Sequence, residues 1–301
     1  MIKISPSSLH ERHQCRRCIW IQYNHGWSWP WSAGLYPRFS ALEENYVPTL
    51  NCCDVLNNFE ADGSVTEAEW LGSKGLVQGR PLIGANSHGR GDVIIGGEFD
   101  LMATYTKNGI KSHAIIDAKT SGYKDFDALK KWAKKLGVTD WKDEAELRAE
   151  YNRQYSEKYL PQLASYAYCM EFPASAANIA EYLEAEPEEL WPRKPTKKRR
   201  RVPKDHDNPI AYEYVSAAGI LMFGFEKNLE LHGDKFHFTC ASTYVELIEP
   251  QPETSSPDWM EIITPLAQKV CDIIAEPEMP PHDETCENCV NEREHQALLD
   301  G

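Results

Sequence analysis

The chain has 301 residues, of which 42% are hydrophobic and 11% aromatic, so it can bury a sizeable core. Its net charge of −14 argues against a protein coated in nucleic-acid-binding surface. The chain has no apolar run of about 18 residues and no amino-terminal signal segment, so we expect a soluble cytoplasmic protein, nuclear in a eukaryote, with no membrane partner. Nine cysteines then indicate reduced thiols or metal ligands rather than a disulfide framework.

Ser5 and Pro6 form a typical helix start, an N-cap followed by proline at the first helical position. We expect this helix to continue to about Tyr23. Cys15 and Cys18 would then lie on one face of it, because residues three apart are neighbours on a helix.

Residues 27–91 show an irregular pattern, in which we expect only a short helix at about residues 39–46. Trp27, Trp29 and Trp31 could stack on unpaired bases. Packing in the core near the first helix is the favoured interpretation of these three side chains.

A β-hairpin is the clearest local signal in the chain. Residues 97–105 have the composition of a strand, and the apolar run in residues 111–117 indicates the returning strand. Asn108-Gly109 between them is the strongest short-range hairpin signal. If these two residues are the whole loop, the residue numbers of each cross-strand pair add up to 217.

This register predicts a cluster of charges. Asp100 lies opposite Asp117, and Glu98 lies opposite Lys119, with all four side chains on one face of the sheet. Two carboxylates held that close repel one another unless a divalent cation lies between them. The ordinary alternative is a solvated hairpin face with a cross-strand Glu98–Lys119 ion pair. The apolar residues 114–116 favour a buried strand that carries chemistry at its end.

Beyond the hairpin we expect three helices, at residues 125–136, 143–158 and 161–171. A Pro-rich, charged stretch at residues 187–209 indicates a loop insertion. Two strands and an amphipathic helix follow, at residues 211–225, 235–247 and 258–274. On the expected third helix, Gln162 and Tyr166 are four residues apart and share a face.

Three short motifs occur in a recognisable order: residues 97–100, residues 116–120, and the Gln162 to Tyr166 segment. Together they resemble the motif series of PD-(D/E)XK nucleases, in particular the RecB-like branch, which includes the iron–sulfur exonucleases associated with CRISPR adaptation. The resemblance covers roughly residues 1–25, 95–170 and 280–290. It implies an α/β fold with a restriction-endonuclease-like core, a mixed central sheet flanked by helices, in one domain over residues 1–301.

The resemblance also implies roles for the motif residues. Asp100 and Asp117 would ligate Mg²⁺ or Mn²⁺, with the carbonyl of Ala118 completing the site. Lys119 would orient the attacking water or stabilise charge on the scissile phosphate. The QxxxY pair, Gln162 and Tyr166, would contact the substrate near the metal.

The implied activity is metal-dependent hydrolysis of DNA phosphodiester bonds, on free ends or single strands. The implied setting is repair, recombination or CRISPR-type processing, with possible partner proteins, in a prokaryotic or phage context. The family usually adds a histidine or glutamate from an upstream helix, and this chain offers only weak candidates, His88 and Glu44. That departure and the acidic composition keep a second hypothesis open, a non-cleaving DNA-binding or assembly subunit with the nuclease fold.

Two Cys-x-x-Cys pairs lie near the two ends of the chain, at Cys15 and Cys18 and at Cys286 and Cys289. Four thiolates suit either a tetrahedral Zn²⁺ or a [4Fe-4S] cluster, and the spacing does not separate the two. The resemblance favours iron–sulfur, although its members commonly use one early and three late cysteines. Either metal would tie residues 1–25 to residues 280–292. We interpret the other cysteines as non-ligands: Cys52, Cys53, Cys169, Cys240 and Cys271.

The expected insertion contains the most basic run of the chain. It could contact DNA phosphates without reading sequence, serve as a nuclear-import signal, or simply be a solvated loop. The run comprises Lys197, Lys198, Arg199, Arg200 and Arg201.

Overall fold

The computed structural model describes residues 2–9, 15–25, 46–57, 64–79, 93–122, 126–174, 214–225, 230–232, 235–237, 240–247, 250–284, 286 and 289–290. The strands are β1 Ile2–Ile4, β2 Val65–Gln78, β3 Val93–Lys107, β4 Ile110–Gly122, β5 Ala217–Phe225, β6 Glu230–His232, β7 Lys235–His237 and β8 Cys240–Leu247. The α-helices are α1 Arg16–His25, α3 Cys52–Leu56, α4 Phe126–Leu136, α5 Glu144–Glu171 and α8 Trp259–Ala275, and 3₁₀ turns are found at η1 Pro6–Leu9 and η3 Val47–Thr49.

The main sheet is mixed. Its strands follow the order β1-β3-β4-β5-β8, and β2 also pairs with β3. The β1–β3 and β4–β5 pairs are parallel, whereas β2–β3, β3–β4 and β5–β8 are antiparallel. The predicted α/β class with a mixed sheet flanked by helices is therefore confirmed.

The β3–β4 hairpin has the predicted register. Leu101 pairs with Ile116 and Lys107 with Ile110, so paired positions sum to 217. Both loop residues have positive φ, 53° at Asn108 and 76° at Gly109, as a type I′ turn requires. Asn and Gly tolerate this left-handed conformation, which is why these two residues determine the strand pairing.

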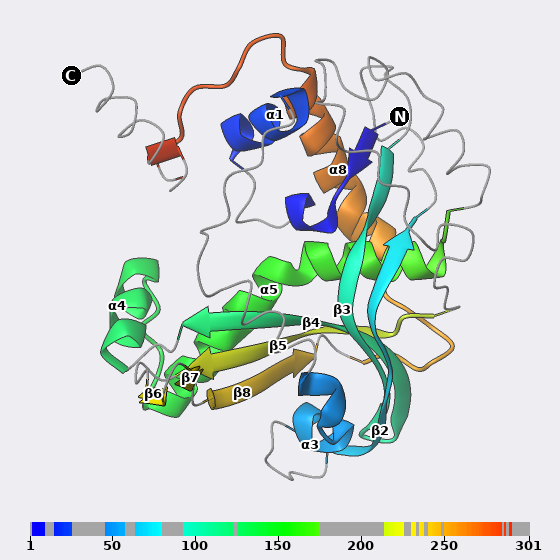
Figure 1. Cartoon of the computed structure of the whole chain (residues 1–301), viewed down its shortest axis with the longest axis vertical. Coiled ribbons are helices and arrows are strands. Elements are labelled where there is room, and N and C mark those ends of the chain that lie inside the picture. Colours follow the sequence, from blue (N-terminus) through cyan, green and yellow to red (C-terminus); the bar gives the residue numbers. More distant parts are fainter. Residues whose placement is uncertain are drawn as a thin grey trace.

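Helices cover the sheet on both faces (Figure 1). Side chains at alternate strand positions point to opposite faces. Met102 and Ile115 belong to the core that also contains buried residues of α1, α5 and α8, whereas Leu101 and Ile116 belong to the core on the α3 side. Asp100 and Asp117 continue the first series, so they lie on the face covered by α5.

The amino-terminal segment differs from its prediction. The helix expected from Ser5 to about Tyr23 is not a single α-helix: a 3₁₀ turn, η1, begins at Pro6, and α1 begins at Arg16. Residues 2–4, just before this turn, pair in parallel with residues 93–95 of β3.

The expected helix break at Pro161 is also wrong, because α5 runs without interruption from Glu144 to Glu171. Proline removes one backbone hydrogen bond, but α5 buries side chains on both sides of it, among them Leu147, Leu163 and Ala167. Packing on this long face keeps the two halves in one helix.

The 65–78 region contains a long strand that the sequence pattern did not reveal. β2 pairs with β3 along most of its length, with register shifts near Glu67 and Gly72. Those irregularities break the strict two-residue alternation by which a strand is recognised. The expected strand at 235–247 divides into β7 and β8, and β6 pairs with β7.

Among the described helices, none combines the length and the apolar character needed to cross a bilayer.

Candidate functional site

The hairpin brings the predicted acids and lysine together. β3–β4 pairing ends at Leu101 and Ile116, so the predicted Asp100–Asp117 and Glu98–Lys119 pairs lie beyond the paired part of the strands. Asp100 Oδ2 accepts a hydrogen bond from the Ala118 N–H at 2.8 Å. Lys119 Nζ lies 2.5 Å from Asp117 Oδ2. Two carboxyl groups and one ammonium group therefore share a small patch under α5.

Glu98 does not join this patch in the predicted way. Its side chain is exposed, and Lys119 pairs with Asp117 instead. The Glu98–Lys119 ion pair of the alternative interpretation is not found among the ion pairs of the described residues. Asp117, at 2% exposure, offers the buried counter-charge, whereas Glu98 remains solvated.

Burial makes the protonation of this patch unusual. Burial, followed by the charge of Asp117, raises the pKa of Asp100 to about 8. Burial alone would lower the pKa of Lys119, but Asp117 and then Asp100 outweigh it, and the pKa of Lys119 is raised. The lysine is therefore a fixed positive charge at neutral pH.

The chemistry of the patch fits a hard divalent cation. Asp117 is buried, and the Lys119 ammonium, 2.5 Å from its Oδ2, is the one cation paired with it among the described residues. Two carboxyl groups share this single ammonium group, and the charge of Asp117 opposes ionisation of Asp100. A second cation would let both carboxylates be charged at once. Oxygens of Asp100 and Asp117 are the ligand type that Mg²⁺ and Mn²⁺ prefer.

Two side chains of helix α5 cover the patch. Gln162 and Tyr166 are both 6% exposed, and Gln162 Nε2 donates to Tyr166 Oη at 3.2 Å. Burial, then the Asp117 charge, raises the pKa of Tyr166, so the phenol stays protonated beside the acids. The predicted QxxxY pair therefore lies at the patch as a hydrogen-bonded unit.

Sequence reasoning missed Tyr159. Its ring centroid lies 5.0 Å from Lys119 Nζ, close enough for a cation–π contact, and its Oη lies 3.2 Å from Tyr155 Oη. Tyr159 is three residues before Gln162 and seven before Tyr166, a spacing that places all three on one helix face. That periodicity was the available signal.

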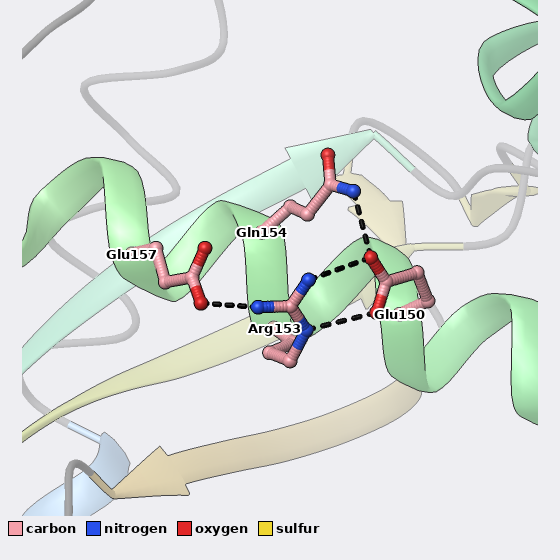
Figure 2. Close-up of polar contacts among 4 residues, drawn as sticks. All are labelled: Glu150, Arg153, Gln154 and Glu157. Carbon is pink, nitrogen blue, oxygen red and sulfur yellow. Dashed lines mark hydrogen bonds and ion pairs between the residues drawn. The ribbon is translucent and has the colours of Figure 1, made fainter. Parts of the chain in front are cut away.

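The opposite face of α5 is a solvent-facing charge network (Figure 2). Arg153 donates to Glu150 at 2.7 and 2.8 Å and pairs with Glu157, while Gln154 donates to Glu150 at 2.7 Å. Hydrogen bonds from Arg153 and then Gln154 lower the pKa of Glu150 to about 2. This network supports the helix that carries the site without touching the site.

Several predicted residues lie outside the described part of the chain. These are the upstream-ligand candidates His88 and Glu44, the basic run from Lys197 to Arg201, and Trp27, Trp29 and Trp31.

The second constellation is a four-cysteine cluster. Cys15 Sγ lies 3.4 Å from Cys289 Sγ, and Cys18 Sγ lies 3.6 Å from Cys286 Sγ and 4.0 Å from Cys289 Sγ. All four sulfurs lie within 4.8 Å of one another, which makes this a possible metal site that joins the two ends of the chain. No second group of this kind is found among the described histidine, cysteine and acidic residues.

Polar contacts dock α1 onto the tail independently of any metal. Arg17 Nη1 donates to Pro280 O at 3.1 Å, Trp20 Nε1 to Glu276 O at 3.0 Å, and Asn24 Nδ2 to Ile274 O at 3.1 Å. The three acceptors extend from the last turn of α8 to Pro280 in the segment that follows it. These bonds hold α1, and with it Cys18, against the tail that carries Cys286 and Cys289.

The thiols need a cation to become thiolates. Burial raises the pKa of Cys15 to about 12 and raises that of Cys18 further. Metal binding would release these protons. Cys52, Cys169 and Cys271 lie apart from the cluster on α3, α5 and α8, as the non-ligand interpretation expects.

Comparison of the chain with protein-family models, with curated proteins and with solved structures found no match.

Proposed function

We propose that this protein is a Mg²⁺- or Mn²⁺-dependent nuclease that hydrolyses DNA phosphodiester bonds. The observation that carries the proposal is the convergence of Asp100, Asp117 and Lys119 on one buried patch of the sheet. The order of the three sequence motifs supports the same reaction. On this proposal the sheet is a PD-(D/E)XK core, and the substrate has free ends or single-stranded regions, in repair, recombination or CRISPR-type processing.

The protein's own residues have distinct roles in this reaction. Asp100 and Asp117, with the Ala118 carbonyl, would hold the metal, which supplies charge neutralisation and an activated water. Lys119 stabilises the negative charge that develops on the phosphate, and its raised pKa keeps it charged, so it does not act as a base. The Tyr159 ring steadies the ammonium group.

Cleavage of labelled single- and double-stranded DNA with Mn²⁺ tests this proposal. Asp117→Ala and Lys119→Ala should abolish cleavage while the proteins stay folded by circular dichroism. Glu67→Ala removes an exposed acid from β2 and serves as the matched control. Unchanged cleavage by both site variants would discard the site.

The second candidate is a DNA-binding or assembly subunit that does not cleave. The described residues place two carboxylates at the patch, and the net charge of the chain is −14. DNA binding by wild-type protein without cleavage in Mg²⁺ or Mn²⁺ would favour this candidate.

For the four-cysteine cluster we propose a single tetrahedral ion, with Zn²⁺ the best fit. A Zn–S bond of about 2.3 Å gives sulfur–sulfur separations of about 3.8 Å around a tetrahedron. Three of the six separations are 3.4, 3.6 and 4.0 Å, and all six are within 4.8 Å. In a [4Fe-4S] cluster each thiolate binds a different iron, so the sulfurs must lie farther apart.

The motif resemblance favours the [4Fe-4S] cluster, which is therefore the alternative to test. Metal analysis after anaerobic purification separates the two. One zinc per chain in colourless protein supports the single ion, whereas about four irons with broad visible absorbance supports the cluster.

A further inference from the structure

Helix α4 is strongly basic in an acidic protein. Between Phe126 and Leu136 it carries one acid, Asp127, and four lysines, whereas the whole chain has a net charge of −14. The lysines are Lys130, Lys131, Lys134 and Lys135.

The lysines share one face of α4. Leu129 and Ala133 are buried against Leu147 of α5, with Trp132 and Tyr151 packed around them. The four lysines fall on the other side of the helix, as the 3.6-residue period requires, and all four are exposed. The apolar side is thus covered by α5, and the basic side faces solvent.

Most of this positive charge is not neutralised by the protein. Lys130 pairs with Asp127 at 2.8 Å. Lys131, Lys134 and Lys135 form no ion pair with the residues that the structure describes. Three neighbouring ammonium groups on one helix face repel one another, so an anionic partner stabilises them.

A row of aromatic rings links the apolar side of α4 to the candidate site. Ring contacts join Trp132 to Tyr151 at 5.1 Å, Tyr151 to Tyr155 at 5.9 Å, and Tyr155 to Tyr159 at 4.9 Å. Tyr159 in turn lies 5.0 Å from Lys119 Nζ. α4 follows β4 directly in the chain, and Figure 1 shows it beside the end towards which β4 points. At ~3.4 Å per phosphate along a duplex strand, the row of rings is at most about six nucleotide steps long.

We propose that the lysine face of α4, formed by Lys130, Lys131, Lys134 and Lys135, binds the phosphate backbone of the DNA that flanks the cleavage point. This inference rests on the proposed nuclease function and names the surface that holds its substrate. The contacts are to phosphates, so they strengthen binding without selecting sequence. In a chain with a net charge of −14, a locally basic face such as this one is where a polyanion is attracted.

Salt-dependent DNA binding tests the inference. The variant Lys131→Gln/Lys134→Gln/Lys135→Gln is compared with wild type by fluorescence anisotropy of a labelled oligonucleotide in Ca²⁺. The control is Lys107→Gln/Lys111→Gln/Lys269→Gln, which removes the same charge at positions away from α4. Each lost phosphate contact lowers the slope of log affinity against log salt by ~0.7–0.9, so the α4 variant should lose about two units of slope. Its affinity at ~0.1 M salt should fall at least tenfold, with less than about a twofold change in the control.

Equal slopes and affinities in the α4 variant and the control would overturn the inference. If wild type still cleaves DNA with Mn²⁺ in that case, only the α4 assignment fails, and the face is left to an acidic protein partner. If wild type neither binds nor cleaves DNA, the proposed function fails as well.

Discussion

The acidic patch and the four-cysteine cluster are assembled in opposite ways. Asp100 and Asp117 are brought together by one two-residue turn, whereas Cys18 and Cys286 are 268 residues apart and meet only when the whole chain has closed. Local chemistry therefore determines the geometry of the first site, and global packing determines the second. The two should respond differently to the same kinds of perturbation.

The largest effect is expected for Asp117→Asn, which should reduce cleavage without changing the metal content of the cysteine cluster. Asp117→Asn removes a negative charge from the patch and should reduce Mn²⁺-dependent cleavage by about 10³-fold or more, ~4 kcal/mol in transition-state stabilisation. The metal at the cysteine cluster should remain at the wild-type ratio. Loss of both cleavage and cysteine-bound metal would show that the two regions are not independent.

Removal of the cysteine-bound metal is the converse perturbation. Cys18→Ser/Cys289→Ser should lose the tightly held metal and lower the thermal midpoint by roughly 10 °C, because metal binding contributes folding free energy. Cys52→Ser is the matched control, since Cys52 is buried on α3 away from the cluster. A wild-type midpoint in the double variant would contradict a structural role for the cluster.

A smaller effect is expected at Gly97, where the amino-terminal segment meets the strand that carries Asp100. A Cβ at Gly97 would lie 2.8 Å from Pro6 Cδ and 3.4 Å from Tyr166 Cε1. Gly97→Ala should therefore cost ~1–3 kcal/mol, measured by urea unfolding, through strain in this contact. Adding Pro6→Ala should recover part of the loss. Full stability in Gly97→Ala would mean that Pro6 moves aside easily.

The smallest effect is expected on the outer face of α5. Arg153 is exposed, and exposed ion pairs contribute little because water screens them. Arg153→Ala should leave cleavage unchanged and shift the thermal midpoint only slightly. A clear loss of activity would indicate that the outer network of Figure 2 positions Tyr159 and Gln162 after all.

The features predictable from sequence were those that depend on neighbouring residues. Asn108-Gly109 determined the hairpin register, and the register placed Asp100 beside Asp117. The helix boundary predicted at Pro161 is wrong, because burial of both halves of α5 outweighs one lost hydrogen bond. β2 was missed because its register shifts hide the strand alternation. The meeting of four cysteines was expected from the motifs, but the separations between their sulfurs required coordinates.

The most direct test of the central claim is the position of Mn²⁺ in crystals of the full chain, located by its anomalous scattering. The proposal predicts a peak between the carboxylates of Asp100 and Asp117, at about 2.0–2.3 Å from their oxygens, that disappears in Asp117→Asn. A peak elsewhere, or none beside these two residues when Mn²⁺ and DNA are both bound, would contradict a shared metal at this patch.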